Sequence, residues 1–301
     1  MSEPDLVHDR TLLQATGKAE EISPMVRRLI APNPSPFTFT GTCTYIIGQG
    51  RVAIVDPGPE SAEHLAAMLA AISGEALDAI FVTHTHRDHS PGARALKAAT
   101  GAPIIGCAPH VPIRDDASGR LDASHDMDYA PDEVLADGEM HAGAGYCIEA
   151  IHTPGHASNH MCFALVEDDS IFCGDHVMAW STTIVAPPDG VMSDYMASLE
   201  KLSQREEAVF YPGHGPSVAE PRRYMRALGN HRRMREQAIL REIGKNALAI
   251  PALVDRIYTG LDERLKKAAA LSVLAHMEDL VARQLVSAGG PATLQAIYSK
   301  A

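Results

Sequence analysis

Four potential metal ligands within six residues constrain this chain more than any other feature: His84, His86, Asp88 and His89. They directly follow the apolar run at 79–82, which predicts a buried strand. In an extended loop, residues 84, 86 and 88 project to one side at a period of two, while residue 89 enters the following turn. A single loop can therefore supply ligands to two metals.

Three further candidate ligands each come just past an apolar run and directly after a glycine: His156, Asp175 and His214. Loops at strand ends collect binding residues because the sheet holds them rigidly, and a glycine lets the backbone approach closely. The chain has 15 histidines, so a single histidine means little. The same arrangement at four strand ends predicts one site assembled from distant segments.

Strands and helices alternate along residues 43–211, beginning with a hairpin that ends at Asp56. Expected helices lie at 60–72, 90–100 and 194–203, and expected strands lie at 103–106, 146–151, 161–166, 170–174 and 208–211. In the second helix, Ser90 is the expected N-cap, Pro91 the first helical residue and Gly101 the stop. The acidic stretch 114–139 is expected to form a long surface loop. This order fits an α/β sandwich whose sheets are covered by helices.

Charge divides the chain near residue 220. Residues 1–220 contain 12 Lys and Arg against 31 Asp and Glu, whereas residues 221–301 contain 14 against 7. The change coincides with the turn signals of Pro-Gly-His-Gly-Pro at 212–216 and with Pro221, a helix-start signal. We therefore predict two domains, a body at 1–220 and a tail at 221–301.

Composition limits the location and the redox chemistry. No window approaches the roughly 18 apolar residues of a membrane span. The N-terminus lacks the basic start and apolar stretch of a secretory signal, so we expect a cytoplasmic protein. Five cysteines without a CxxC pair argue against a disulfide framework and against a cysteine zinc cluster, and reduced, mostly buried thiols are expected.

The motifs THTHRDHS, TPGH, FCGD and YPGHG, in this order, resemble the metallo-β-lactamase superfamily. The resemblance implies an αββα sandwich with a two-metal site. It implies that one metal is held by His84, His86 and His156, that the other is held by Asp88, His89 and His214, and that Asp175 bridges both. Imidazole and carboxylate ligands suit zinc best, so two Zn²⁺ ions are expected, with iron and manganese as alternatives.

Within that superfamily the sequence is most similar to the lactamase-beta-like protein 2 branch, which includes endoribonucleases. The similarity is carried by NPSPFTFTGTCTYIIG at 33–48, TPGHASNHM, YPGHGP and HRRMREQ at 231–237. It implies a small C-terminal winged-helix domain. Helical patterns near 221–243, 250–259 and 266–284, with a wing hairpin at 284–298, agree with that domain.

Two departures from other superfamily members bear on the chemistry. The cysteine ligand of the commonest true β-lactamases has no counterpart here, since Cys173 precedes Asp175 by two residues and is expected to face the core. Oxygen-reducing di-iron relatives have a glutamate at the second position of HxHxDH, where this chain has His86. This difference favours hydrolysis over redox chemistry.

The expected reaction is hydrolysis by a metal-bridging hydroxide, which would attack a phosphodiester, a thioester or a lactone. Asp88 is the predicted catalytic residue, orienting the hydroxide and accepting its proton. His176, Tyr195 and a metal-bound water are the candidates for the leaving-group acid. Among the other histidines, His160 and His176 lie near the predicted site, and surface positions are expected for His110, His125 and His141.

Three functions remain open. The first is a single-stranded RNA endonuclease, in which tail arginines track the phosphate backbone; these are Arg222, Arg223, Arg226, Arg232, Arg233 and Arg235. The second is a glyoxalase II-like thioesterase, a lactonase or a β-lactamase acting on a small molecule, with the tail serving packing or homodimerisation. The third is a nucleic-acid-binding regulator with a structural metal site. A membrane partner is not expected.

Overall fold

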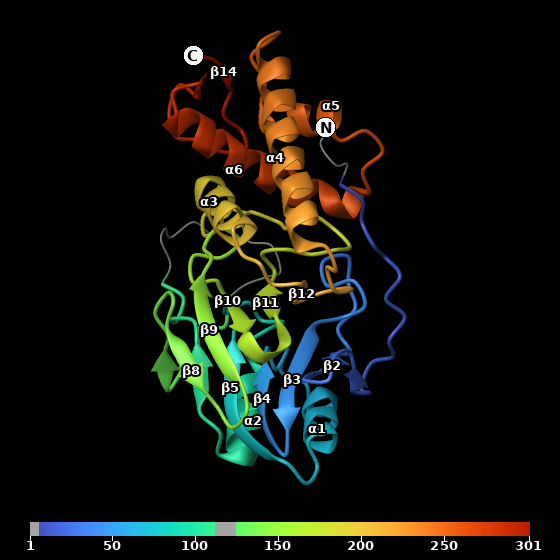
Figure 1. Cartoon of the computed structure of the whole chain (residues 1–301). Coiled ribbons are helices and arrows are strands. Elements are labelled where there is room, and N and C mark those ends of the chain that lie inside the picture. The colour runs from blue at the N-terminus through green and yellow to red at the C-terminus, as the bar shows by residue number, and fades with distance from the viewer. Residues whose placement is uncertain (1–5, 112–124) are drawn as a thin grey trace.

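A computed structural model describes residues 6–111 and 125–301. The body consists of two β-sheets packed against each other, and the tail consists mainly of helices (Figure 1). Of the acidic stretch predicted as a loop, residues 114–124 lie outside the described residues. The remainder is loop apart from one short strand at Glu133–Val134.

The first sheet contains seven described strands that are adjacent in chain order. They are β1 (Glu20–Glu21), β2 (Val26–Ile30), β3 (Cys43–Gln49), β4 (Arg51–Val55), β5 (Ala76–Val82), β6 (Ile104–Gly106) and β7 (Glu133–Val134). Pairing is antiparallel from β1 to β4 and parallel from β4 to β7. The predicted hairpin is formed by β3 and β4, which turn at Gly50 with a φ of 73°. The body therefore begins much as its sequence predicts.

Two helices accompany this sheet, α1 (Ala62–Ala71) and α2 (Gly92–Thr100). The predicted start of α2 is wrong by one position, because Pro91 occupies the N-cap and makes no side-chain cap hydrogen bond. Ser90 instead donates its hydroxyl to Asp126 Oδ2 at 3.1 Å. The predicted stop is confirmed, since Gly101 ends the helix with a left-handed φ of 81°.

The second sheet has the strand order β12-β11-β10-β9-β8. Its strands are β8 (Met140–Ala142), β9 (Cys147–His152), β10 (Met161–Leu165), β11 (Ser170–Gly174) and β12 (Val209–Pro212). Alternate residues of β10 face opposite sides. Phe163 packs towards the first sheet, whereas Cys162 packs into a core shared with α3 (Met192–Ser203).

Aromatic side chains join the two sheets. Tyr45 of β3 lies 5.2 Å from Phe172 of β11, and Phe81 of β5 lies 5.3 Å from Phe163 of β10, measured between ring centroids. The helices α1 and α2 pack on the first sheet and α3 packs on the second. The predicted αββα sandwich is therefore confirmed.

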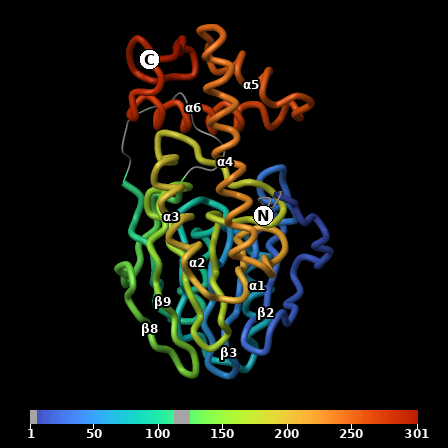
Figure 2. Tube along the Cα trace, turned by 45° about the horizontal axis from the view of Figure 1, so that its top comes forward, coloured from blue at the N-terminus to red at the C-terminus, as the bar shows by residue number. Residues whose placement is uncertain are grey.

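The tail has helices at the three predicted places and a short hairpin, whose second strand lies just beyond the wing predicted at 284–298. These elements are α4 (Pro221–Ile243), α5 (Ile250–Ile257), α6 (Lys266–Ala282), β13 (Val286–Ser287) and β14 (Ser299–Lys300). Figures 1 and 2 show α4 leading from the sandwich into the tail. Its first half, including Met225 and Leu228, packs into the core around α3, and its second half, including Ile239, packs into the tail core. The boundary predicted after residue 220 stays a prediction, although α4 begins there.

Composition led us to expect no membrane-spanning segment and reduced, mostly buried cysteines. Among the described residues, no helix has both the length and the apolar stretch needed to cross a bilayer. All five cysteines are free thiols, and four of them are buried. Cys173 is one of these and donates its thiol to the Val177 carbonyl, so it faces the core as expected.

Candidate metal centre

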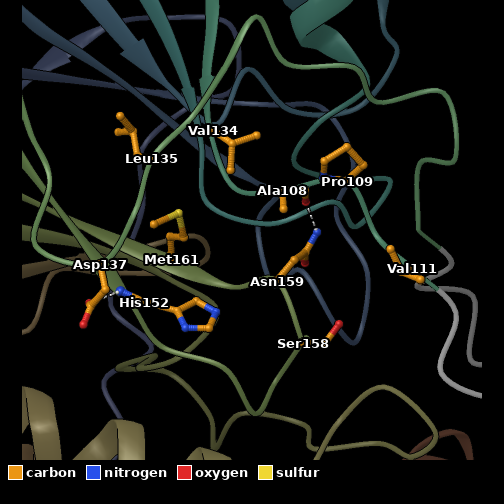
Figure 3. A pocket seen from close by; sticks show the side chains of 10 residues that line it. All are labelled: Ala108, Pro109, Val111, Val134, Leu135, Asp137, His152, Ser158, Asn159 and Met161. Carbon is orange, nitrogen blue, oxygen red and sulfur yellow. Dashed lines mark hydrogen bonds between the residues drawn. The ribbon is translucent and has the colours of Figure 1, made fainter.

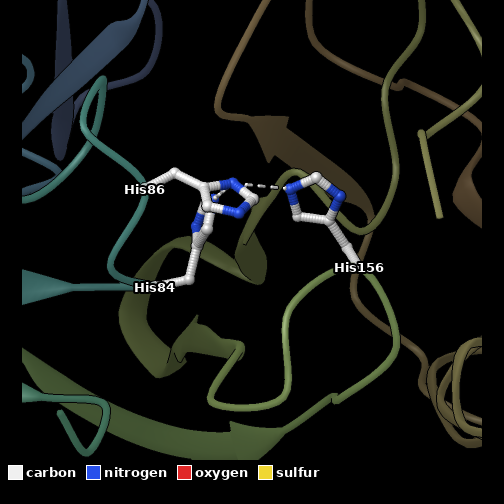
Figure 4. Close-up of side chains that lie close together, drawn as sticks. All are labelled: His84, His86 and His156. Carbon is white, nitrogen blue, oxygen red and sulfur yellow. Dashed lines mark hydrogen bonds between the residues drawn. The ribbon is translucent and has the colours of Figure 1, made fainter. Parts of the chain in front are cut away.

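Three histidine side chains lie close together (Figure 4). His84 and His86 follow strand β5, and His156 follows strand β9. His84 Nε2 lies 3.0 Å from His86 Nδ1, which lies 3.1 Å from His156 Nε2. Burial holds the pKa values of His84 and His86 well below their usual range, and neighbouring imidazoles lower them further. These rings are therefore neutral at pH 7, and their lone pairs can bind a cation.

A second group of possible ligands lies beside the first and contains Asp88, His89 and His214. His214 Nε2 is 3.1 Å from Asp88 Oδ2 and 3.3 Å from His89 Nε2. His214 extends from the loop after β12, whereas the other two belong to the loop after β5. The group therefore joins the two sheets at their common end.

Asp175, at the end of β11, lies between the two groups. Its Oδ2 is 3.6 Å from His156 Nε2, and its Oδ1 is 3.5 Å from both His89 Nε2 and His214 Nε2. One carboxylate oxygen thus faces each group, as expected of a bridging ligand. The structure brings all seven predicted ligands together.

Buried charges in this cluster fit a pair of divalent cations. Burial opposes a charge on His214, but Asp175 and Asp88 outweigh it and raise its pKa to about 9. Burial likewise opposes ionisation of Asp88, yet His89 and His214 hold its pKa well below the usual range. Asp175 Oδ1 is buried without a hydrogen-bond partner among the described residues. Such an orphaned oxygen among imidazole nitrogens suits a metal better than a proton.

Asp56 orients the ligand loop through its contacts with Thr83 and His89. Its Oδ2 lies 2.8 Å from His89 Nδ1 and accepts the Thr83 hydroxyl at 2.8 Å, and its Oδ1 accepts the Thr83 amide at 2.8 Å. A carboxylate on the far nitrogen of a ligand histidine fixes its tautomer and its direction. Sequence reasoning saw only a turn at Asp56, but this residue also follows a strand, and the strand-end rule used for the other ligands would have found it.

Backbone carbonyls orient two more ligands. His156 Nδ1 lies 2.7 Å from the Ile184 carbonyl, and His214 Nδ1 lies 3.3 Å from the Gly41 carbonyl. Both contacts leave Nε2 directed at the cluster. The site is therefore held by segments from several parts of the body.

Two of the predicted glycines are needed for close approach. A Cβ at Gly213 would lie 2.6 Å from Asp175 Oδ1, and one at Gly174 would lie 2.6 Å from His160 Nε2. Gly174 also has a φ of 45°. A side chain at Gly213 would push against the ligand Asp175, and one at Gly174 would displace His160, which agrees with the close approach inferred from sequence.

His160 and His176 lie near the site, and both are buried. His160 Nε2 accepts the Asp175 amide at 3.2 Å, so it positions the bridging carboxylate. Burial lowers the pKa of His176 to about 3, and its ring packs against Tyr195. The Tyr195 hydroxyl donates to the His176 carbonyl at 3.1 Å. Neither His176 nor Tyr195 is placed to donate a proton to a leaving group.

The surface positions predicted for His110 and His125 are wrong. Their rings stack at 3.5 Å, and both contact the Asp189 carboxylate, at 3.4 Å from His110 Nδ1 and 3.1 Å from His125 Nε2. His125 Nδ1 also lies 2.7 Å from the Thr85 hydroxyl. No local sequence pattern predicts this cluster, because its members lie far apart in the chain. His141 is half-buried and packs edge-on against Phe81.

The family model of the metallo-beta-lactamase superfamily matches residues 37–214, which is more than half of the chain. The chain belongs to the metallo-β-lactamase superfamily. The beta-lactamase associated winged helix domain matches residues 249–291. This superfamily member is thus a hydrolase with a histidine and aspartate cluster suited to two metals, and it carries the winged-helix tail implied by its sequence.

Curated relatives include fungal proteins and a protein of Drosophila melanogaster. The chain is 33% identical over 285 residues to the atrochrysone carboxyl ACP thioesterase AgnL7 of Paecilomyces divaricatus, covering 90% of this chain and 82% of that one. It is 30% identical over 266 residues to the beta-lactamase-like protein 2 homolog of Drosophila melanogaster, covering 85% and 87%. A lactamase-like protein of Pestalotiopsis microspora is 35% identical over 203 residues, and the chain covers 57% of its length.

Solved structures share the complete fold. A metallo-beta-lactamase family protein from Thermus thermophilus superposes with a TM-score of 0.76 at 21% identity, covering 93% of this chain and 100% of that one. A beta-lactamase domain protein from Burkholderia ambifaria gives 0.77 at 18% identity, covering 97% and 96%. At these identities the similarity shows the fold alone.

Proposed function

We propose that this protein is a zinc-dependent thioesterase that hydrolyses acyl thioesters. The observation that carries the proposal is the similarity to an ACP thioesterase over 90% of the chain, combined with an intact set of seven possible ligands. Five imidazoles and two carboxylates form a donor set that suits zinc. A thioester carbonyl develops negative charge during hydrolysis, which a cationic centre stabilises.

The tail arginines favour a small substrate over RNA. Five of the six arginines considered for RNA binding already have partners within the protein. These partners are Glu206 for Arg222, Glu220 for Arg223, Thr183 for Arg232, Asn230 for Arg233 and the Tyr258 ring for Arg235. A phosphate backbone would have to displace these contacts. The segment is therefore better explained as packing and surface ion pairs.

Asp88 is the proposed proton acceptor. Its side chain is 24% exposed, against 10% for Asp175, so a water on the substrate side can reach it. Two bound metals supply Lewis-acid stabilisation and lower the pKa of water. Asp88 then takes one proton as the water oxygen bonds to the acyl carbon. The carbon–sulfur bond breaks, and the departing thiolate takes a proton from solvent.

An endoribonuclease remains the second candidate, favoured by the similarity to the beta-lactamase-like protein 2 homolog and by the branch resemblance seen in the sequence. In that case single-stranded RNA would be the substrate. A homodimer held by the tail is compatible with either function.

The test is turnover by the zinc-loaded protein on a panel of acetyl-CoA, S-lactoylglutathione, a fluorescent single-stranded RNA, an acyl-homoserine lactone and nitrocefin. His84→Ala, measured in parallel, controls for contaminating enzymes. We expect thioester hydrolysis that disappears in His84→Ala. RNA cleavage that disappears in the variant, without thioester turnover, would overturn the proposal in favour of the endonuclease.

A further inference from the structure

Pockets in the body and in the tail differ in the charge of their lining. The body pocket has a volume of about 520 Å³ and is mainly apolar, with no arginine or lysine among the described residues that line it (Figure 3). The tail pocket has a volume of about 350 Å³ and is lined by residues of α4 and of the end of α5. Its charged lining residues are Arg235, Arg241, Arg256 and Glu242. We call it the cationic pocket.

The single carboxylate of the cationic pocket does not balance the arginines. Glu242 Oε1 lies 2.6 Å from Lys245 Nζ, and its Oε2 lies 3.4 Å from Arg256 Nη1. Lys245 lies outside the pocket. Four cations, namely the three arginines and Lys245, therefore share one negative charge. A surplus of positive charge remains in the pocket.

Arg235 is held in position but lacks an acceptor. Its Cζ lies 4.5 Å from the centroid of the Tyr258 ring. Such a contact uses the face of the guanidinium and leaves the N–H groups of its edge free. Arg235 Nε is buried and has no hydrogen-bond partner among the described residues. Buried guanidinium N–H groups normally have an acceptor, and an anion in the cationic pocket would supply it.

Arg241 is also available to a ligand. It is exposed, and it forms no hydrogen bond or ion pair with any described residue. Most arginines considered for RNA binding, by contrast, have partners within the protein. His231 adds an uncharged ring to the pocket, because burial and the nearby Arg235 lower its pKa to about 4. A ligand can therefore meet both charged and neutral donors here.

The cationic pocket has an apolar side as well. Met234, Ala238 and Ile257 line it, and Met234 is 67% exposed. Guanidinium groups bind phosphate oxygens through paired N–H groups, whereas a flexible methionine adapts to apolar groups of different shape. The volume is within the range of sites that bind small organic molecules, so it exceeds the needs of a bare phosphate. An occupant with a phosphate and an apolar part matches both sides.

We propose that the cationic pocket binds a small organic phosphate, with the phosphate on the arginines and the organic part against Met234, Ala238 and Ile257. The site is separate from the metal centre, because none of its described lining residues is a candidate metal ligand. The inference is therefore independent of the proposed thioesterase function.

Two exposed arginines of α4 provide a matched test. Arg241 lines the pocket, whereas Arg226 lies outside it, and neither has an ion-pair partner among the described residues. Arg241→Gln and Arg226→Gln therefore remove the same charge at different places. Arg235→Lys is a second pocket variant, which keeps the charge but loses the Nε donor. Thermal unfolding confirms that each variant is folded.

Binding is measured by calorimetry on the zinc-loaded protein with adenosine monophosphate (AMP), in about 0.15 M salt to screen attraction between distant charges. We expect AMP to bind at least about tenfold more tightly than adenosine. Arg241→Gln and Arg235→Lys should each weaken AMP binding by about tenfold, and Arg226→Gln should leave it unchanged. Equal losses in Arg241→Gln and Arg226→Gln, or no binding of AMP to the wild type, would overturn the proposal.

Three further arms identify the source of the phosphate and its place of binding. Inorganic phosphate should bind more weakly than AMP, and equal affinity would overturn the assignment to an organic phosphate. His84→Ala, which damages the metal centre, should bind AMP as the wild type does. Loss of AMP binding in His84→Ala but not in Arg241→Gln would place AMP at the metal centre and overturn the proposal. A short single-stranded RNA that binds through Arg241, without binding of AMP, would overturn it in favour of a nucleic-acid surface.

Discussion

The metal centre of the body and helix α4 of the tail both concentrate ionisable side chains. The charges of these side chains are balanced differently in the two regions. At the metal centre, imidazoles and carboxylates face one another, and Asp175 Oδ1 has no hydrogen-bond partner among the described residues. Along α4, most arginines meet a carboxylate, a carbonyl or an aromatic ring. Imidazole and carboxylate groups that converge on one point form a donor set for cations, whereas charges that are matched within the protein indicate a structural role.

The largest effect should come from a carboxylate of the metal centre. Asp88→Asn removes the proposed proton acceptor, so we expect kcat to fall by about 10²–10⁴-fold. Turnover of a thioester and metal content per chain are measured together. Asp255→Asn in the tail, where the carboxylate is 68% exposed, is the matched control and should stay within about twofold. Wild-type turnover in Asp88→Asn with both metals bound would contradict this assignment.

The next effect concerns the support beneath the ligands. Asp56→Asn weakens the contact that directs His89, and we expect zinc affinity to fall by about 10–100-fold. Competition with a chromophoric chelator measures it. Asp78→Asn, which only breaks an ion pair with Arg51, should leave affinity unchanged. Equal losses in the two variants would mean that Asp56 has only a general structural role.

A smaller effect tests whether α4 is structural. The buried Arg232 donates to the Thr183 carbonyl, and the Thr183 hydroxyl donates to the Asp175 carbonyl at 2.8 Å. Arg232→Met leaves a buried carbonyl unpaired, so we expect a loss of about 1–3 kcal/mol in unfolding free energy and lower turnover. Arg233→Met, at an exposed position, is the control in urea unfolding. If the two variants behave alike, Arg232 does not support the site.

The smallest effect is a pH dependence within the tail. Burial lowers the pKa of His276 to about 3, so its ring is neutral in the folded protein, while the unfolded chain takes up a proton near the ordinary pKa of 6.5. Stability from this residue is present above pH 6.5 and is lost as pH falls from 6.5 towards 3. Between pH 7 and pH 5.5 the loss should be about 1 kcal/mol.

Urea unfolding of the wild type and His276→Leu at both pH values measures this difference, and the titration of the metal ligands cancels in the comparison. The variant should lose less stability on acidification than the wild type. Identical losses would show that His276 is protonated in the folded state or contacts water.

Local patterns predicted most of the sandwich and all seven possible ligands, because the signal for each ligand lies within a few residues of a strand end. The hairpin at β3 and β4 and the stop at Gly101 were likewise set by local chemistry. The His110, His125 and Asp189 cluster could not be predicted, since it depends on contacts across up to 79 residues of chain, which have no periodic signature. The partners of Arg222 and Arg232, which lie 16 and 49 residues away in the chain, were missed for the same reason.

The division of α4 between two cores has a consequence for cooperativity. Met225 and Leu228 pack with α3 of the body, and Ile239 and Ile243 pack with α5 and α6 of the tail. Because helix formation is cooperative along the chain, unfolding of one half of α4 weakens the other half. Body and tail are therefore expected to melt in a single calorimetric transition, so that two regions with opposite charge behave as one folding unit.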